Sequence, residues 1–265
     1  MSSYVGQHAE FYDIFYVDKP YEKEAAFVHE CLQKYSTGTS VRLLELACGT
    51  GSHALALEKF GYKIVATDYS EDLLSVARRK SDEVTSSVDF RWQDMCSMEL
   101  TDESFDAAIC LFDSIGYVET NEALMQVLQG VHRHLRPEGL FVFEFWHAAA
   151  MLRNYDPLRV RCWSTPQREL VRISETKIDC ARQLARVTYT IYNLSHDGTY
   201  SRLEETQTNR YFLVREMEGW LSHCGFIPLK WFAGYTSEEN ITVDTWHILV
   251  VARKDESRTT FGMER

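Results

Sequence analysis

Val41-Arg-Leu-Leu-Glu-Leu-Ala-Cys-Gly-Thr-Gly51 joins an apolar run, one acid and two glycines that are separated by a single residue. The apolar run predicts a buried strand, and after Gly51 the apolar residues recur at helical spacing until Gly61, so the glycines lie at a corner between a strand and a helix. Gly49 and Gly51 can adopt backbone angles closed to other residues and carry no Cβ. A ligand can therefore lie against bare backbone amides near a helix N-terminus.

Two kinds of ligand fit such a corner. Gly49, Gly51 and Ala54 satisfy a loose dinucleotide fingerprint, which alone is a weak signal. Glu45, however, lies four residues before the first glycine, where its carboxylate would face a pyrophosphate at close range. S-adenosylmethionine carries a sulfonium and an ammonium and no phosphate. The acid therefore favours S-adenosylmethionine over NAD.

Acids also end the next two predicted strands. Asp68 follows the strand at 63–68, about twenty residues beyond the glycines, where nucleotide-binding α/β folds place a carboxylate that accepts both ribose hydroxyls. Tyr69 would offer its ring to the adenine. Asp68 could instead cap the next helix, although Ser70 is already a natural N-cap. Asp94, next to Met95, follows the strand at 88–92 and can accept from the exocyclic amine of adenine.

The pattern along the chain predicts the fold class. Five buried runs alternate with helical stretches, which indicates a parallel sheet with helices on both faces. From about residue 161 polar and apolar residues alternate with period two, which indicates an antiparallel insertion after the fifth strand. We expect an α/β, Rossmann-like, seven-stranded, mostly parallel sheet with strands at 41–46, 63–68, 88–92, 105–112, 140–145, 227–232 and 245–252.

Composition narrows the class of protein. The chain has 265 residues and a net charge of −11, and nucleic-acid binding draws most of its affinity from basic side chains, so a nucleic-acid partner is disfavoured. The seven cysteines are odd in number and scattered without a CxxC pair, as in a reduced cytoplasmic protein without a zinc site. No apolar run approaches the roughly 20 residues that span a bilayer, and the N-terminus lacks the order of a signal peptide.

Several sequence motifs resemble those of a known enzyme family. ELACGTG, FDAAICLFDSIGY and RPEGLFVFEFW together resemble the class I S-adenosylmethionine-dependent methyltransferases. More narrowly, HAEFYDIFY, SIGY, EFW and the insertion resemble bacterial N,N-dimethyltransferases of nucleotide-linked amino sugars and, less closely, glycine and sarcosine N-methyltransferases. The resemblance implies that Tyr16 lies at the active site and that Asp68 holds the ribose. Asp113 departs from the serine-like residue expected in the sugar enzymes.

We expect the chain to consist of three parts. Residues 1–160 and 214–253 would form the S-adenosylmethionine-binding domain, with an aromatic arm and helix at 1–36. Residues 161–213 would form a lid, or a surface for the acceptor or for a homodimer, and 254–265 a polar tail. The residues expected to bind the cofactor are Tyr16, Tyr21, Glu45, Ala47, Gly49, Gly51, Asp68, Tyr69, Asp94, Met95 and Leu111.

Methyl transfer from a sulfonium is an in-line displacement, so catalysis consists mostly of placing a lone pair about 3 Å from the methyl carbon and excluding water. A carboxylate or phenol nearby can orient the acceptor or take its proton. We nominate Asp113 and Tyr16 as catalytic residues, with Tyr117, Trp146 and His147 as walls. Asp113 could instead cap the turn that follows it.

The sequence therefore predicts a methyltransferase that uses no metal and acts on a small molecule, most readily at an amine nitrogen of an amino sugar or amino acid. Three alternatives stay open: methylation of oxygen or carbon in a small acceptor, methylation of a macromolecule, and a protein that binds S-adenosylmethionine without turnover.

Overall fold

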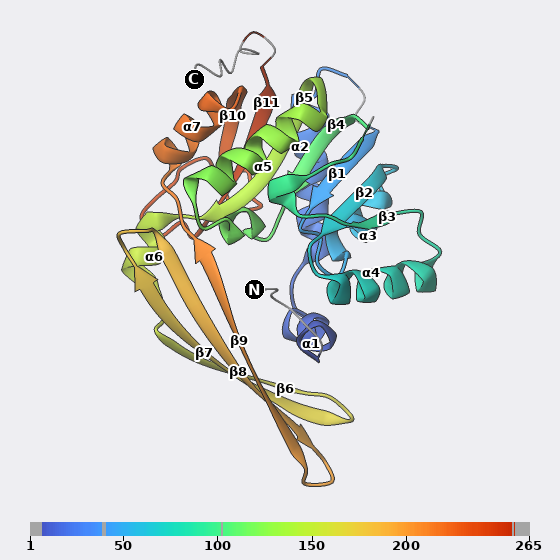
Figure 1. The fold of residues 1–265 in the computed structure, drawn as a ribbon, viewed down its shortest axis with the longest axis vertical. Coiled ribbons are helices and arrows are strands. Elements are labelled where there is room, and N and C mark those ends of the chain that lie inside the picture. Colours follow the sequence, from blue (N-terminus) through green and yellow to red (C-terminus); the bar gives the residue numbers. More distant parts are fainter. Residues whose placement is uncertain (1–6, 39–40, 102, 256, 258–265) are drawn as a thin grey trace.

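The computed structural model describes residues 7–38, 41–101, 103–255 and 257, with the backbone alone for residues 7 and 8. Its main sheet has seven strands in the order β10-β11-β5-β4-β1-β2-β3 (Figure 1). Strands β1 to β5 run parallel and β11 runs antiparallel to both its neighbours, which confirms the predicted Rossmann-like α/β fold. The strands are β1 Arg42–Leu46, β2 Lys63–Asp68, β3 Asp89–Trp92, β4 Phe105–Cys110, β5 Leu135–Trp146, β10 Phe226–Ala233 and β11 His247–Lys254.

Helices cover both faces of this sheet, which explains why its central strands are apolar throughout. Adjacent residues of a strand point to opposite faces, so Leu43 and Leu44 belong to different cores. The core around Leu44 is closed by α5 (Asn121–His134) and α7 (Val214–His223). The core around Leu43 is closed by α2 (Tyr21–Tyr35), α3 (Ser52–Glu58) and α4 (Glu71–Val84).

The insertion is a four-stranded antiparallel sheet that extends away from the main sheet (Figure 1). Its strands are β6 Leu158–Ser164, β7 Arg168–Asp179, β8 Leu184–Ser195 and β9 Tyr200–Arg210. It begins three residues before residue 161, where we predict its start. β6 is an edge strand whose apolar residues Leu158 and Val160 are exposed, so its sequence does not show which face is buried.

Helix α1 (Gln7–Phe15) connects the two sheets. Phe11 and Phe15 pack against Leu170 and Ile191 of the antiparallel sheet. On its other side, α1 packs through Tyr12 against Leu73 of α4. The aromatic residues of the arm therefore attach α1 to both layers.

The glycine corner follows the predicted path from strand to helix. Gly49 and Gly51 have φ angles of 58° and 75°, and a Cβ at Gly51 would lie 2.7 Å from the ring of Phe90. Gly51 is the N-cap of α3. Glycine at position 51 is thus required by both the backbone angle and the packing of β3.

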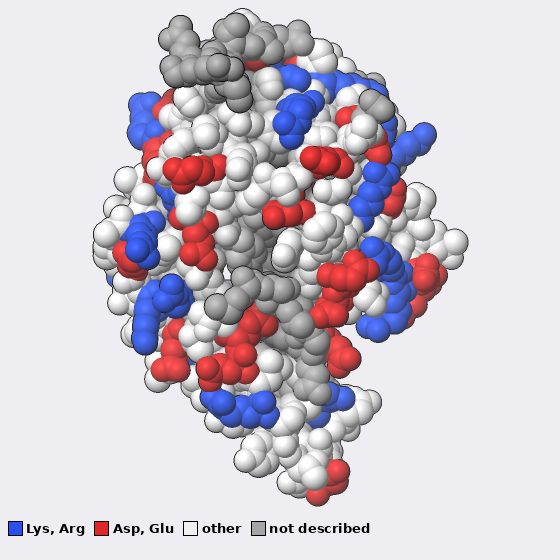
Figure 2. All heavy atoms as spheres, viewed as in Figure 1, with Lys and Arg blue, Asp and Glu red and all other residues white. Residues whose placement is uncertain are grey.

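One face of the described surface carries charges of both signs. On the face in Figure 2, basic side chains lie scattered among acidic ones. None of the helices that the structure describes is long and apolar enough to cross a membrane. The absence of a nucleic-acid partner stays a prediction from the net charge. The structure records all seven cysteines as free thiols.

Candidate functional site

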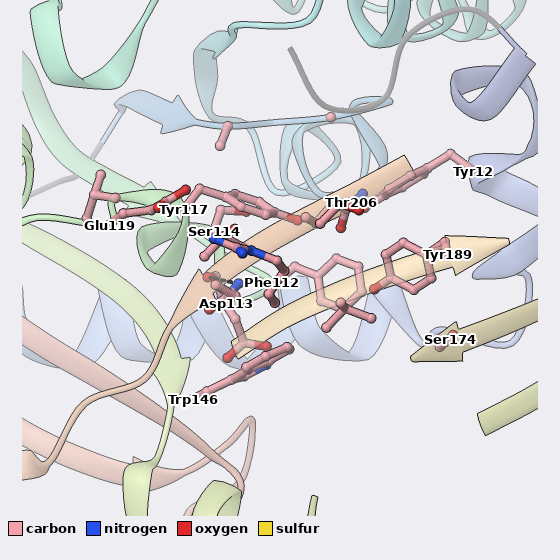
Figure 3. Close-up of a pocket in the computed structure, with 18 of the residues that line it drawn as sticks. Tyr12, Phe112, Asp113, Ser114, Tyr117, Glu119, Trp146, Ser174, Tyr189 and Thr206 are labelled. Atoms are coloured by element: carbon pink, nitrogen blue, oxygen red, sulfur yellow. Dashed lines mark hydrogen bonds between the residues drawn. The ribbon is translucent and has the colours of Figure 1, made fainter. Parts of the chain in front are cut away.

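A cavity of about 930 Å³ lies between the carboxyl ends of the parallel strands, α1 and the antiparallel sheet. In Figure 3, Asp113 and Ser114 come from the segment after β4, whereas Tyr189 and Ser174 come from the antiparallel strands. This is the place where ligands bind in open α/β sheets. The predicted site residues that line the cavity are Tyr16, Ala47, Gly49, Asp68, Tyr69, Asp94, Met95 and Asp113.

A side cavity of about 20 Å³ shares Ala47 with the large one. Three of the four remaining predicted residues line it, namely Tyr21, Glu45 and Leu111. Gly51 is among the lining residues of neither cavity, and its place in the site is indirect because it shapes the corner behind Gly49.

Asp68 ties the glycine corner to the end of β2. Its carboxylate accepts the backbone N–H of Gly49 and that of Ser70, both at 2.8 Å. Burial raises the pKa of Asp68 above its ordinary value, and these two N–H donors oppose the rise. The Ser70 side chain separately caps α4 by accepting the N–H of Leu73. Because a carboxylate offers about four acceptor positions, Asp68 retains capacity for two ligand hydroxyls.

Glu45 is a buried carboxylate with an unused oxygen. It is 2% exposed, and its Oε2 has no hydrogen-bond partner among the residues that the structure describes. Burial, followed by the charge of Asp68, raises the pKa of Glu45 to about 8. An unpaired buried acid is costly to ionise unless a cation lies beside it. The position therefore suits a positively charged ligand group.

The adenine side of the predicted site is open and aromatic. Tyr69 is half exposed, and its ring lies 5.5 Å from that of Trp92. Asp94 accepts the N–H of Cys96 at 2.8 Å and so begins the 3-10 helix at Met95–Ser97. Asp94 has further acceptor positions for a ligand amine.

Asp113 is buried, and although it holds the N-cap position of the turn at Ser114–Tyr117, its side chain does not cap that turn. It is 3% exposed, and its side chain makes no capping hydrogen bond to the turn at Ser114–Tyr117, so the capping alternative is wrong. Its carboxylate instead lies 2.8 Å from Nδ1 of His247, which is 134 residues away in β11. Phe112 and Asp113 both have positive φ, near 57° and 55°. Non-glycine residues adopt this conformation at a cost of about 1 kcal/mol or more each, and the pairing with His247 offsets part of it.

Glu144 of β5 extends this pair into a cluster. It accepts hydrogen bonds from the Tyr235 hydroxyl and the Phe112 N–H, and its Oε2 lies 3.9 Å from Nδ1 of His247. Asp113 is the main cause that raises the pKa of His247 to about 9. Burial raises the pKa of Glu144 to about 7. The cluster can therefore exchange protons between about pH 7 and 9.

Asp113, Glu144 and His247 are also the one group of potential metal ligands among the described residues, with donor atoms within 4.8 Å of one another. Their polar atoms already bind one another or neighbouring groups, which makes them a self-sufficient hydrogen-bonded cluster. The expectation of a metal-free site stays a prediction.

If that expectation holds, prolonged dialysis against EDTA leaves both the melting temperature and the turnover number unchanged. A fall of several degrees that Mg²⁺, Mn²⁺ or Zn²⁺ restores would show instead that the cluster holds a metal.

Tyr16 lies where the two halves of the cavity meet. Its ring packs on Phe112, with centroids 4.9 Å apart, and on Tyr12 at 4.8 Å. The guanidinium of Arg172 lies 5.7 Å from the Tyr16 ring centroid. Of the other residues predicted to form walls, Tyr117 and Trp146 line the cavity. His147 does not line it, and its Nδ1 lies 3.0 Å from the carbonyl oxygen of Thr245.

The chain is similar in sequence to known methyltransferases. A family model described as a methyltransferase domain matches residues 43–139. Over 233 residues, 87% of this chain and 90% of the relative, the chain is 28% identical to YqeM of Bacillus subtilis, whose name gives the class methyltransferase and no acceptor. A second relative is the dTDP-3-amino-3,4,6-trideoxy-alpha-D-glucopyranose N,N-dimethyltransferase of Streptomyces venezuelae. The two chains are 33% identical over 145 residues, and the aligned part covers 54% of this chain and 59% of that enzyme.

The fold agrees. An S-adenosylmethionine-dependent methyltransferase from Clostridium acetobutylicum superposes with a TM-score of 0.81 at 21% identity, over 94% of this chain and 98% of that one. Together these matches support a class I S-adenosylmethionine-dependent methyltransferase, with the methyltransferase domain matched at residues 43–139 and the fold shared over nearly the whole chain. The prediction of a methyltransferase is thereby confirmed, and the alternative of a binder without turnover is set aside.

Sequence reasoning missed part of this methyltransferase's cavity. His247 begins β11 as a partly exposed histidine and carries no local signal of its role. Tyr12 was visible only as one ring of an aromatic arm, yet it lines both cavities. The arginines of β6 and β7 occupy alternating positions that look like ordinary strand residues in the sequence. Only the pairing of the two strands brings these arginines together on one wall of the cavity.

Proposed function

We propose that this methyltransferase transfers a methyl group from S-adenosylmethionine to an amine nitrogen of a small acceptor bound between the strand ends and the antiparallel sheet. The single observation that carries the proposal is the cavity, which has carboxylates of the main sheet on one side and polar side chains of the insertion on the other. The relative from Streptomyces venezuelae, an amino-sugar N,N-dimethyltransferase by name, supports an amine acceptor.

The residues present fit the cofactor. Asp68 would accept the ribose hydroxyls, Asp94 the adenine amine, and Tyr69 would cover the adenine ring. The unpaired Oε2 of Glu45 would face the positive charge of the methionine part. When bound, S-adenosylmethionine supplies an electrophilic methyl group.

The remaining residues would position the acceptor and handle its proton. Tyr16, Phe112 and Trp146 would exclude water from the region where the lone pair must align. Asp113 would act as a positioning residue by holding Nδ1–H of His247, which leaves Nε2 of His247 for the acceptor. A nitrogen that gains a methyl group carries a surplus proton. Within the cluster of Asp113, Glu144 and His247, Glu144 is the group to receive it near neutral pH, because its pKa of about 7 leaves it partly ionised there.

An oxygen acceptor is the second candidate. It is favoured by the same cluster, because His247, once deprotonated above its pKa of about 9, can take a proton from a hydroxyl group. Incubation of the protein with S-adenosylmethionine and matched panels of amines, amino acids, amino sugars and hydroxyl compounds distinguishes the two. We expect a mass increase of 14 or 28 Da, one or two methyl groups, in an amine. An increase confined to hydroxyl compounds would contradict the amine assignment.

The raised pKa of Glu45 predicts that binding of S-adenosylmethionine is linked to proton release. In the free protein a pKa of about 8 keeps Glu45 mostly protonated at pH 7, whereas a cation beside it favours the ionised form. Affinity should therefore rise with pH between 6 and 7, by at most about tenfold per pH unit. Calorimetry at pH 7 in two buffers of different ionisation enthalpy should show release of up to one proton.

Glu45→Gln is the matched control, because it keeps the shape and removes the titration. The variant should bind with little dependence on pH and without that proton release. Identical proton release in the wild type and in Glu45→Gln would assign the effect to another group and remove Glu45 from the cation site.

A further inference from the structure

The antiparallel wall of the cavity is basic, in contrast to the strand ends. The arginines that line the cavity all come from β6, β7 and β8. The acids at the carboxyl ends of the main sheet, among them Asp68, Asp94 and Asp113, lie on the other side. In a protein of net charge −11 this concentration of positive charge in one wall needs an explanation. The arginines of the wall are Arg159, Arg161, Arg172 and Arg186.

Two of these arginines oppose each other directly. In the pairing of β6 with β7, Arg161 lies opposite Arg172, and Arg159 lies opposite Ser174. Like charges directly opposite on neighbouring strands destabilise a sheet. Arg159 has a partial counter-charge in Asp156, 3.7 Å away. Arg161 and Arg172 form no ion pair with any residue in the part of the chain that the structure describes.

Arg172 is the most unusual member of the wall. It is 7% exposed, and its Nε has no hydrogen-bond partner among the described residues. Its guanidinium lies among four aromatic rings, with centroid distances of 4.8 Å to Phe15, 5.0 Å to Trp163, 5.2 Å to Tyr189 and 5.7 Å to Tyr16. A buried charge is normally paired or strongly hydrogen-bonded.

The aromatic rings account for only part of this arrangement. Cation–π contacts stabilise a guanidinium by about 0.5–2 kcal/mol and could hold Arg172 as a structural residue. They supply no acceptor for its Nε–H, however, and they do not offset the charge of Arg161 opposite. Both features are explained if an anion binds between the two side chains, since a guanidinium can donate two parallel hydrogen bonds to a carboxylate or phosphate.

We propose that Arg161 and Arg172, with Arg159 beside them, bind an anionic oxygen group of the acceptor, a phosphate or a carboxylate. The inference rests on the proposed function for the identity of the ligand as the acceptor. Tyr16 adjoins both Arg172 and Phe112, so the anionic group lies next to the part of the cavity where the methyl group is transferred. The acceptor is therefore an amine or hydroxyl compound that carries a negative charge elsewhere in the molecule.

Calorimetry on the protein loaded with S-adenosylhomocysteine tests the inference. The probes are sodium pyrophosphate, phosphate and acetate at constant ionic strength, which distinguish a phosphate site from a carboxylate site. We expect at least one probe to bind the wild type and to bind at least tenfold more weakly to Arg161→Gln and Arg172→Gln. Arg161 is exposed, so its variant tests the inference even if Arg172→Gln fails to fold.

Arg202→Gln is the matched control. Arg202 is an exposed arginine of β9 that pairs with Glu204 and lies outside the cavity wall, so its variant should bind the probe within twofold of the wild type. Absence of binding by all three probes, or equal weakening in Arg161→Gln and Arg202→Gln, would overturn the inference. Failure of S-adenosylhomocysteine to bind would count against the proposed function instead, and the probes would then be measured on the protein alone.

Discussion

Replacement of Asp68 by Ala is expected to weaken the binding of S-adenosylmethionine by about 1.5–3 kcal/mol, or about 10- to 150-fold, because a charged acceptor is withdrawn from two hydroxyls. The structure adds a second effect. Asp68 also accepts the N–H groups of Gly49 and Ser70, so the variant loses the link between the glycine corner and β2. We therefore expect a lower melting temperature together with the lower affinity, both measured on the same preparation.

Asp68→Asn separates the two effects. The N–H groups of Gly49 and Ser70 bind different oxygens of Asp68, and the single amide oxygen of Asn can accept only one of them, so part of the stability should return, while the weaker acceptor leaves the affinity reduced. Unchanged affinity of Asp68→Ala for S-adenosylmethionine by calorimetry would remove Asp68 from the cofactor site.

Replacement of Asp113 by Asn should lower the turnover number by about 100-fold, a typical loss for a group that supports proton transfer, and leave the affinity for S-adenosylmethionine within twofold. Asn keeps the volume of the buried side chain but removes the charge that is the largest cause of the raised pKa of His247. The pKa of His247 should accordingly fall from about 9 towards its ordinary value near 6.5. Side-chain NMR titration of His247 measures this directly and does not require a known acceptor.

Asp106 provides a control for the loss of a carboxylate elsewhere. It accepts the N–H groups of Val41 and Arg42 at the opposite end of β4 and lies outside the cavity wall, so Asp106→Asn should alter stability without altering the titration of His247. A normal turnover number in Asp113→Asn would show that the pair with His247 takes no part in the reaction. Loss of folding in Asp113→Asn, with Asp106→Asn still folded, would indicate a structural role for Asp113.

The cofactor half of the site could be predicted from the sequence because its geometry is local. Each of Glu45, Asp68 and Asp94 is at or beside the end of a strand, and parallel strands bring these ends to one edge of the sheet. Periodicity predicted the strands, so it also predicted where the acids meet. The first antiparallel strand begins at Leu158, three residues before the point near residue 161 where the alternation becomes visible, because an exposed edge strand has no buried face to set its pattern.

The acceptor half could not be predicted because its residues meet only through long-range contacts. His247 reaches Asp113 across 134 residues of sequence. Arg161 and Arg172 face each other only through the register of β6 and β7. The sequence makes Asp113 a candidate, but only its contact with His247 distinguishes a role in the cluster from a role as a cap.

Crystallographic electron density for the protein with S-adenosylhomocysteine would show the ligand at the proposed cofactor site. We expect density in the large cavity, with the ribose hydroxyls on the carboxylate of Asp68, the adenine beside Asp94 and Tyr69, and the amino group of the amino-acid part directed towards Glu45. Density for the ligand outside this cavity, or within it with the ribose away from Asp68, would show that these residues do not bind the cofactor.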